Sequence, residues 1–189
     1  MSSFEFVFSL FGLLLGLGLA EVLGGLGNSI QERGKIKVGW LTPLLGVLVA
    51  LDLISFWTFA WSVRDTVASN YPTLLAGLLI FGTYYLVARL VFPRDHAQWP
   101  NFDDYYFQHK SWVLGGVFLC NVAAMTATFA LGAPLFPSAV SMVSLPLFYI
   151  LCFTAIFARG RNINIALLII LVAEYIVFPL LAVLLQTRG

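Results

Sequence analysis

Six apolar segments, each about 20 residues or more in length, follow one another along this chain, and crossing a membrane as a helix takes about that many apolar residues. Because lipid offers backbone groups no hydrogen-bond partner, such segments must be α-helices. The sequence therefore predicts an all-α integral membrane protein, a bundle of six transmembrane helices at roughly 4–27, 39–61, 72–93, 112–132, 138–158 and 163–186.

The composition leaves no room for a soluble domain. Hydrophobic residues make up 60% of the 189 residues and charged residues only 10%, whereas about a quarter of a soluble domain is charged. A single transmembrane domain over 1–189 is expected, with membrane lipids as its surroundings. The formal net charge of +1 gives no basic bias toward nucleic acid.

The distribution of Lys and Arg predicts the orientation. Eight of the ten basic residues lie in the loops after helices one, three and five or near the end of helix three: Arg33, Lys35, Lys37, Arg89, Arg94, Lys110, Arg159 and Arg161. Such an excess marks the cytoplasmic side. Both termini are therefore expected to be non-cytoplasmic, and a bacterial inner (cytoplasmic) membrane is the expected location.

Two segments show a weak internal similarity. "LLIFGTYYLV" (78–87) aligns with "IILVAEYIVF" (169–178) so that Tyr84 matches Tyr175. With three helices in each half, the halves would be inverted in the membrane, which is a common plan of transporters. The alternative is a chance alignment of two apolar helices.

The longest loop, 94–111, is expected to lie at the cytoplasmic interface. Its stretch "PNFDDYYFQHK" predicts a short interfacial helix that Asn101 caps, with acids at its N-terminus and Lys110 near its end. Four side chains in this loop could take part in chemistry: His96, Asp103, Asp104 and His109. Their spacing matches no known metal-ligand pattern, so a solvated loop without a metal is expected.

Three acids lie within the predicted spans, where each costs about 2.5–3.5 kcal/mol on insertion scales. They are Glu21, Asp52 and Glu174, and the one clear base in the spans is Arg89. Glu21 and Arg89 both lie toward the cytoplasm, so we expect them to form a structural ion pair. Asp52 and Glu174 then have no basic partner, and acids in that situation bind protons or cations.

Small residues recur on the first helix. Gly12, Gly16, Ala20 and Gly24 form one stripe, and stripes of this kind let helices approach closely. We therefore expect this helix to be central, with Glu21 pointing into the bundle. The face left for lipid consists of Phe11, Leu15, Leu19, Val22 and Leu26.

Glu174 is expected to lie beside a proline kink in its helix. Pro179 has no N–H, so the carbonyl of Tyr175 loses its helical partner. Carboxylate, phenol and carbonyl are all oxygen donors, which hard cations prefer. Together with other polar side chains in the spans they predict a cation or proton path of Glu174, Tyr175, Asp52, Ser55 and Asn121. The alternative is a kink and interhelical hydrogen bonds that only shape packing.

Three functions remain open. The first is a transporter or channel for protons or small cations, and the second is a structural or accessory subunit of a larger membrane complex. The third, an enzyme acting on a lipid at the cytoplasmic interface through the four loop side chains, is the least expected because such sites are usually tighter clusters. No cofactor is predicted. Because six helices enclose little volume, we expect a homo-oligomer or a membrane-protein partner.

Overall fold

The computed structural model describes residues 3–34, 37–95, 98–132, 134–136 and 138–187, and this part of the chain contains helices and no β-strand. The helices are α1 (Ser3–Gln31), the 3₁₀ turn η1 (Glu32–Gly34), α2 (Leu41–Ser62), α3 (Tyr71–Arg89), α4 (Phe102–Ala130), α5 (Ala139–Phe157) and α6 (Arg161–Gln186). Six of them are long and apolar enough to cross a membrane. The expected all-helical fold is confirmed, and it is compatible with an integral membrane protein.

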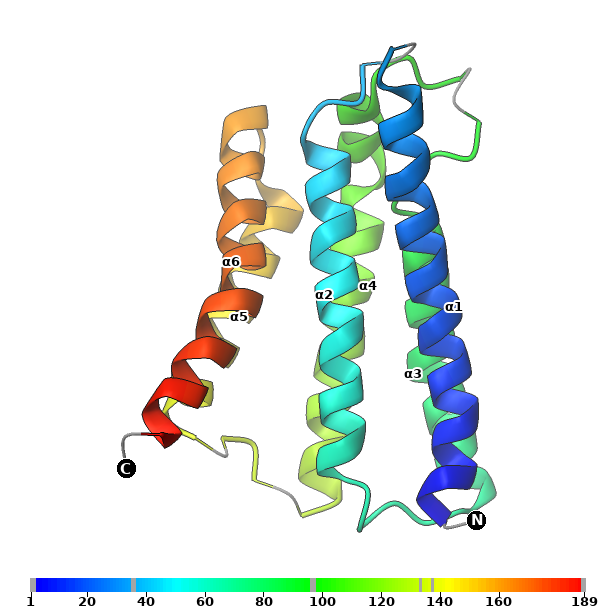
Figure 1. Ribbon diagram of the computed structural model, residues 1–189, viewed down its shortest axis with the longest axis vertical. Coiled ribbons are helices and arrows are strands. Elements are labelled where there is room, and N and C mark those ends of the chain that lie inside the picture. The colour runs from blue at the N-terminus through cyan, green and yellow to red at the C-terminus, as the bar shows by residue number, and fades with distance from the viewer. Residues whose placement is uncertain (1–2, 35–36, 96–97, 133, 137, 188–189) are drawn as a thin grey trace.

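The helices form one bundle with alternating directions (Figure 1). α1 packs against α2 and α3, and α3 packs against α4. The pair α5 and α6 packs on the other side, against α4 and α2. The described chain begins and ends at the same end of the bundle, which we call the terminal end. The loop residues 32–34, 37–40, 90–95, 98–101 and 158–160 lie at the opposite end, which we call the basic end.

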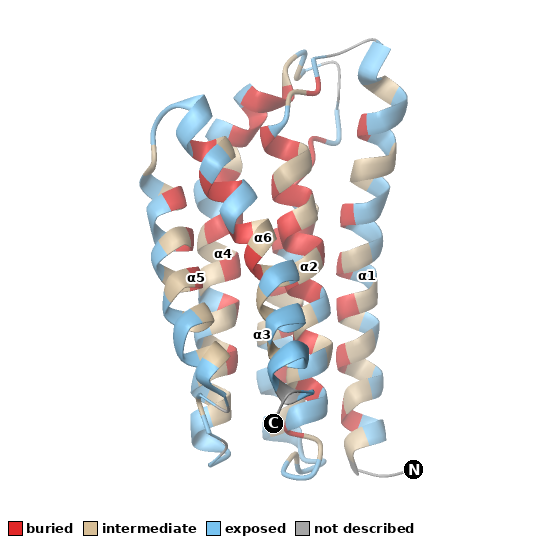
Figure 2. Ribbon diagram, turned by 60° about the vertical axis from the view of Figure 1, so that its left-hand side comes forward, coloured by how far each residue is buried: buried red, intermediate tan, exposed pale blue. Residues whose placement is uncertain are grey.

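The outer surface of the bundle is apolar, as contact with lipid requires. Buried residues face the interior while exposed ones cover the outside (Figure 2). Several large exposed side chains are hydrophobic, among them Leu79, Phe129 and Leu184. The core contains Phe56 and Tyr84 at about its middle, with relative exposures of 2% and 0%.

The segment 102–111 differs from the expected loop, because it is the first part of α4. The Asn101 side chain caps this helix and accepts a hydrogen bond from the backbone N–H of Asp103 at 3.1 Å. No Pro or Gly interrupts 102–114, so the backbone stays helical where the hydropathy falls. Asp103 and Lys110 are also buried, so the expectation of a solvated loop is wrong for them. His96 lies outside the described residues.

The expected orientation of the first helix is also wrong. Phe11, Leu15 and Val22, assigned above to the lipid face, are buried. Ala20 of the small-residue stripe is exposed. A Cβ added at Gly16 or Gly24 would meet no atom within 4 Å, and one at Gly12 would meet only Phe8 of the same helix.

Two other glycines make the close contacts of α1. A Cβ at Gly18 would lie 3.5 Å from Leu53 of α2, and one at Gly25 would lie 2.2 Å from the Phe92 ring. A Cβ at Gly18 would thus be at ordinary contact distance, whereas Gly25 leaves no room for one. The stripe of Gly12, Gly16, Ala20 and Gly24 therefore faces away from the chain's other helices.

Candidate functional site

A fully buried carboxylate, that of Asp52, lies at the centre of the largest polar network in the middle of the bundle. Its Oδ2 accepts hydrogen bonds from the Tyr84 hydroxyl and from Asn121 Nδ2, the latter at 2.9 Å. Its Oδ1 accepts one from the Tyr175 hydroxyl and a longer one from Ser55 Oγ at 3.4 Å. Residues of α2, α3, α4 and α6 thus meet at one carboxylate.

This network unites four of the five residues of the path predicted from the sequence: Asp52, Ser55, Asn121 and Tyr175. Sequence reasoning did not assign Tyr84 to the site. The signal that could have found it is the alignment of Tyr84 with Tyr175, since both donate to the same acid. Asn121 is held in place because its Nδ2 also donates to the Val117 carbonyl at 3.0 Å.

Glu174, the fifth residue of that path, does not join the network. It precedes Tyr175 on α6 and has a relative exposure of only 8%. Neither of its carboxylate oxygens has a hydrogen-bond partner among the described residues. Burying a carboxylate without a partner is costly, and a bound proton or cation would lower that cost.

A cavity of about 750 Å³ lies between α2, α4, α5 and α6, and Glu174 lines it. Its inner end includes Ser55, Asn121 and Tyr175, three of the residues bonded to Asp52. At the terminal end it reaches exposed residues, including Ser62 and Ser138. The cavity therefore connects the terminal end of the bundle with the centre.

Between Asp52 and the basic end, the space between α2, α4 and α6 is closely packed. Leu45 and Leu48 of α2, Leu114 of α4, and Leu168 and Leu171 of α6 have relative exposures of 0–1%. These side chains fill the space between the helices. The path from the cavity toward the basic end is thus closed by apolar packing.

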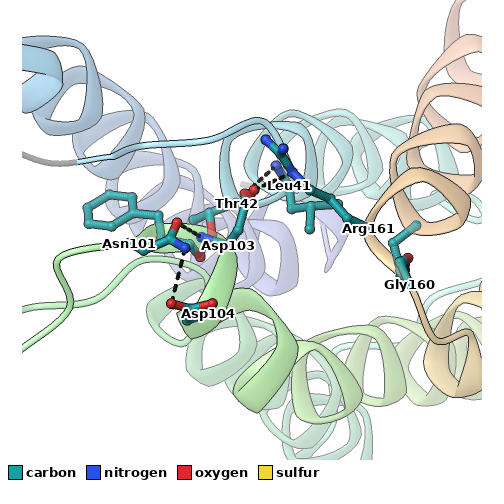
Figure 3. A network of polar contacts seen from close by, with 9 residues as sticks. Leu41, Thr42, Asn101, Asp103, Asp104, Gly160 and Arg161 are labelled. Atoms are coloured by element: carbon teal, nitrogen blue, oxygen red, sulfur yellow. Dashed lines mark hydrogen bonds and ion pairs between the residues drawn. The ribbon is translucent and has the colours of Figure 1, made fainter.

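Polar contacts hold the helices together at the basic end (Figure 3). Asp103 of α4 accepts a hydrogen bond from the Leu41 backbone N–H at 3.2 Å, and its Oδ2 lies 2.8 Å from Arg161 Nε. The Thr42 hydroxyl donates to the Phe102 carbonyl at 2.7 Å. The first turns of α2, α4 and α6 are joined in this way.

A second set of contacts at this end involves Lys110. Its Nζ donates to the Ala155 carbonyl at 2.9 Å, to the Ala158 carbonyl, and to Asn164 Oδ1 at 2.9 Å. The ammonium thus lies at the C-terminus of α5, where the helix dipole favours a cation. The Tyr106 hydroxyl also donates to Asn164 Oδ1, at 2.9 Å. This arrangement could not be predicted from the sequence because it depends on where α5 ends.

Glu21 and Arg89 are brought together on the outer side of α1 and α3. Arg89 Nε lies 4.0 Å from Glu21 Oε1, and their side chains are 33% and 40% exposed. Arg89 also donates to the Tyr85 hydroxyl at 3.0 Å. Glu21 therefore lies at the rim of the bundle and does not point into it.

His109 and the two cysteines, which could also take part in chemistry, make packing contacts instead. His109 stacks on Tyr105 with ring centroids 4.0 Å apart, and no group of three or more potential metal ligands occurs among the described residues. The thiol of Cys120 lies 3.6 Å from the Ile80 carbonyl, and that of Cys152 lies 3.6 Å from the Leu114 carbonyl.

Comparison of the chain with protein-family models, with curated proteins and with solved structures gives no match. The function is therefore argued from the geometry of the site.

Proposed function

We propose that this protein is a transporter of protons or small cations, with Glu174 and Asp52 as its cation-binding groups. The observation that carries this proposal is the Glu174 carboxylate, which is buried, lacks a hydrogen-bond partner among the described residues and lines the cavity. A proton or cation that enters from the terminal end would meet this carboxylate. Buried acids that line a cavity are typical of ion and proton pathways.

Asp52 is the next acid along the path. Tyr175 lines the cavity and its hydroxyl donates to Asp52, so this residue links the cavity to the buried carboxylate. Protons pass readily between groups joined by hydrogen bonds. We therefore assign Tyr175 and Asn121 as the groups that hold Asp52 in place at the inner end of the path.

The packed half of the bundle favours a transporter over an open channel. A channel needs a continuous path, whereas alternating access closes one half while the other is open. In the conformation described, the cavity reaches the terminal end and Leu45, Leu114 and Leu168 close the other half. Transport would require the contacts at the basic end, such as that of Asp103 with Arg161, to rearrange.

Flux measurements test this function. The purified protein is reconstituted into liposomes, and proton, Na⁺ and K⁺ fluxes are followed under an imposed gradient. We expect Glu174→Gln to abolish a flux that the unaltered protein shows. Glu21→Gln is the matched control, because it removes an acid that does not line the cavity. Absence of flux in the unaltered protein, or equal flux in the Glu174 variant, contradicts the proposal.

We also propose that the basic end faces the cytoplasm of a bacterial inner membrane, so that both termini are outside. The support is the distribution of Lys and Arg given above. Alkaline phosphatase, which is active only outside the cytoplasm, serves as the reporter. A fusion at the C-terminus is expected to be active and one in the loop 90–101 inactive, and the reverse pattern would overturn this orientation.

A second candidate function is that of a structural or accessory subunit. The specific observation is the outward-facing stripe of Gly12, Gly16, Ala20 and Gly24, because a helix of a second protein, or of a second copy, could approach it closely. Purification under native conditions with a constant partner, and without flux, would favour it. The lipid-enzyme alternative has the least support, since Asp103 is held by Arg161 and Leu41 while His109 is stacked on Tyr105.

A further inference from the structure

The size of the cavity exceeds what a proton or a bare metal ion needs. Its volume is about 750 Å³, while a water molecule in the liquid takes about 30 Å³. Pockets of about 300–1,000 Å³ typically enclose a drug-sized organic molecule. The dimensions therefore suit a ligand with many non-hydrogen atoms.

The walls of the cavity are mainly apolar and aromatic. Phe59 of α2, Phe148 and Tyr149 of α5, and Phe178 of α6 all line it. Aromatic faces attract cations, and they also bury apolar groups. Small hydroxyls, including Ser141 and Ser144 of α5, provide a few polar contacts along one wall. Such a surface favours a molecule with an apolar body.

The charged groups that line the cavity favour a ligand of positive charge. Glu174 is the only formally charged residue among the described residues that line it. Asp52 lies behind this surface with both oxygens already bonded, so one carboxylate is free to bind a ligand. An anion would find no basic side chain there, whereas a ligand with one positive charge would neutralise Glu174.

We propose that this cavity is a binding site for an amphipathic organic cation of single positive charge, which Glu174 and the aromatic walls hold. The inference rests on the proposed function, in which Glu174 is the cation-binding group, and it names the class of substrate. The organic cation and a proton compete for the same carboxylate. Binding of one releases the other, so inward movement of protons can drive outward movement of the cation.

Two probe ions of the same shape and opposite charge test the site. Tetraphenylphosphonium is a permanent cation, and tetraphenylborate is its anionic counterpart. Binding to the purified full-length protein in lipid nanodiscs is measured by isothermal titration calorimetry. We expect saturable binding of tetraphenylphosphonium only, and in weakly buffered solution a proton should be released as it binds. Lower pH should weaken binding, because a protonated Glu174 has no charge to offer.

Variants test which residues bind the probe cation. Glu174→Gln is expected to weaken tetraphenylphosphonium binding by about tenfold or more, since it leaves the cation without its counter-charge, and to abolish proton release. Glu21→Gln should change neither. If Glu174→Gln does not fold, Ser144→Phe serves instead, because it keeps the carboxylate and fills part of the cavity. It should weaken binding of the probe as well.

The outcomes separate this inference from the proposed function. Glu174-dependent proton or metal-ion flux without tetraphenylphosphonium binding overturns the inference and leaves the transporter intact. Binding as expected without any flux supports the site and contradicts the transporter. Equal binding of both probe ions, or unchanged binding in both the Glu174→Gln and the Ser144→Phe variants, shows a non-selective apolar crevice and overturns the inference.

Discussion

Tyr84 of α3 and Tyr175 of α6 donate hydrogen bonds to different oxygens of the same carboxylate, that of Asp52 on α2. Helices that are distant in the sequence are thus joined through one acid in the middle of the bundle. The two tyrosines are also the pair that the weak internal similarity aligns. The two aligned tyrosines therefore share one hydrogen-bond acceptor.

We expect Tyr84→Phe and Tyr175→Phe each to destabilise the protein, because each leaves a buried carboxylate oxygen with one donor fewer. The expected loss in the free energy of unfolding is about 1–3 kcal/mol. Denaturation in mixed micelles measures it. Tyr71→Phe is the control, since Tyr71 is 75% exposed, and an equal loss in all three variants would argue against the network.

We expect Gly39→Ala to be strongly destabilising. Gly39 has a φ of +63°, which costs other residues about 1–2 kcal/mol, and its new Cβ would lie 2.1 Å from Asp103 Oδ1. The substitution would displace the carboxylate that Leu41 and Arg161 share. Gly34→Ala is the control, because its Cβ would have open space. Thermal unfolding should separate the two variants, and similar midpoints would contradict this account.

We expect substitution of two adjacent glycines of α1 by alanine to change the free energy of unfolding in opposite directions. Gly25→Ala places a Cβ 2.2 Å from the Phe92 ring, and overpacking of this kind costs about 1–3 kcal/mol. Gly24→Ala meets open space and gains up to about 1 kcal/mol of helix propensity. Unfolding in detergent tests both. If Gly24→Ala is the more damaging, α1 faces the bundle as first expected from the sequence.

We expect Lys110→Met to loosen the contact of α4 with α5 and α6. The variant leaves the Ala155 carbonyl without its buried side-chain donor and Asn164 Oδ1 with the Tyr106 hydroxyl alone, at a cost of about 1–3 kcal/mol. Lys37→Met is the control because Lys37 is exposed. Thermal unfolding in detergent compares them. An unchanged stability in Lys110→Met would mean that another donor replaces the ammonium.

The helical fold could be predicted from the sequence because the cause is local. A run of apolar residues must satisfy its own backbone in lipid, so length and hydropathy identify a helix wherever it packs. The ends of a helix are harder to predict from hydropathy where polar residues continue it. At 102–111 the hydropathy falls but the hydrogen bonding continues, so α4 begins at Phe102 and not near residue 112.

The candidate site could be predicted in part. Acids and their polar neighbours are conspicuous in apolar spans, which is why Asp52, Asn121 and Tyr175 could be selected. A tyrosine is common in membrane helices, so the sequence does not mark Tyr84 as a hydrogen-bond partner of Asp52. The cavity could not be predicted at all, because its volume depends on how α5 and α6 lean against α2 and α4.

The sequence by itself determined that the chain forms six apolar helices, that its basic residues gather at one end and that three acids lie within the spans. Only the tertiary structure decided which face of each helix is buried. In a membrane both faces of a helix are apolar, so hydropathy does not distinguish the lipid side from the core. The two sides differ in how side chains fill the space between helices. Leu15 and Val22 therefore face inward while Gly16 and Gly24 face outward.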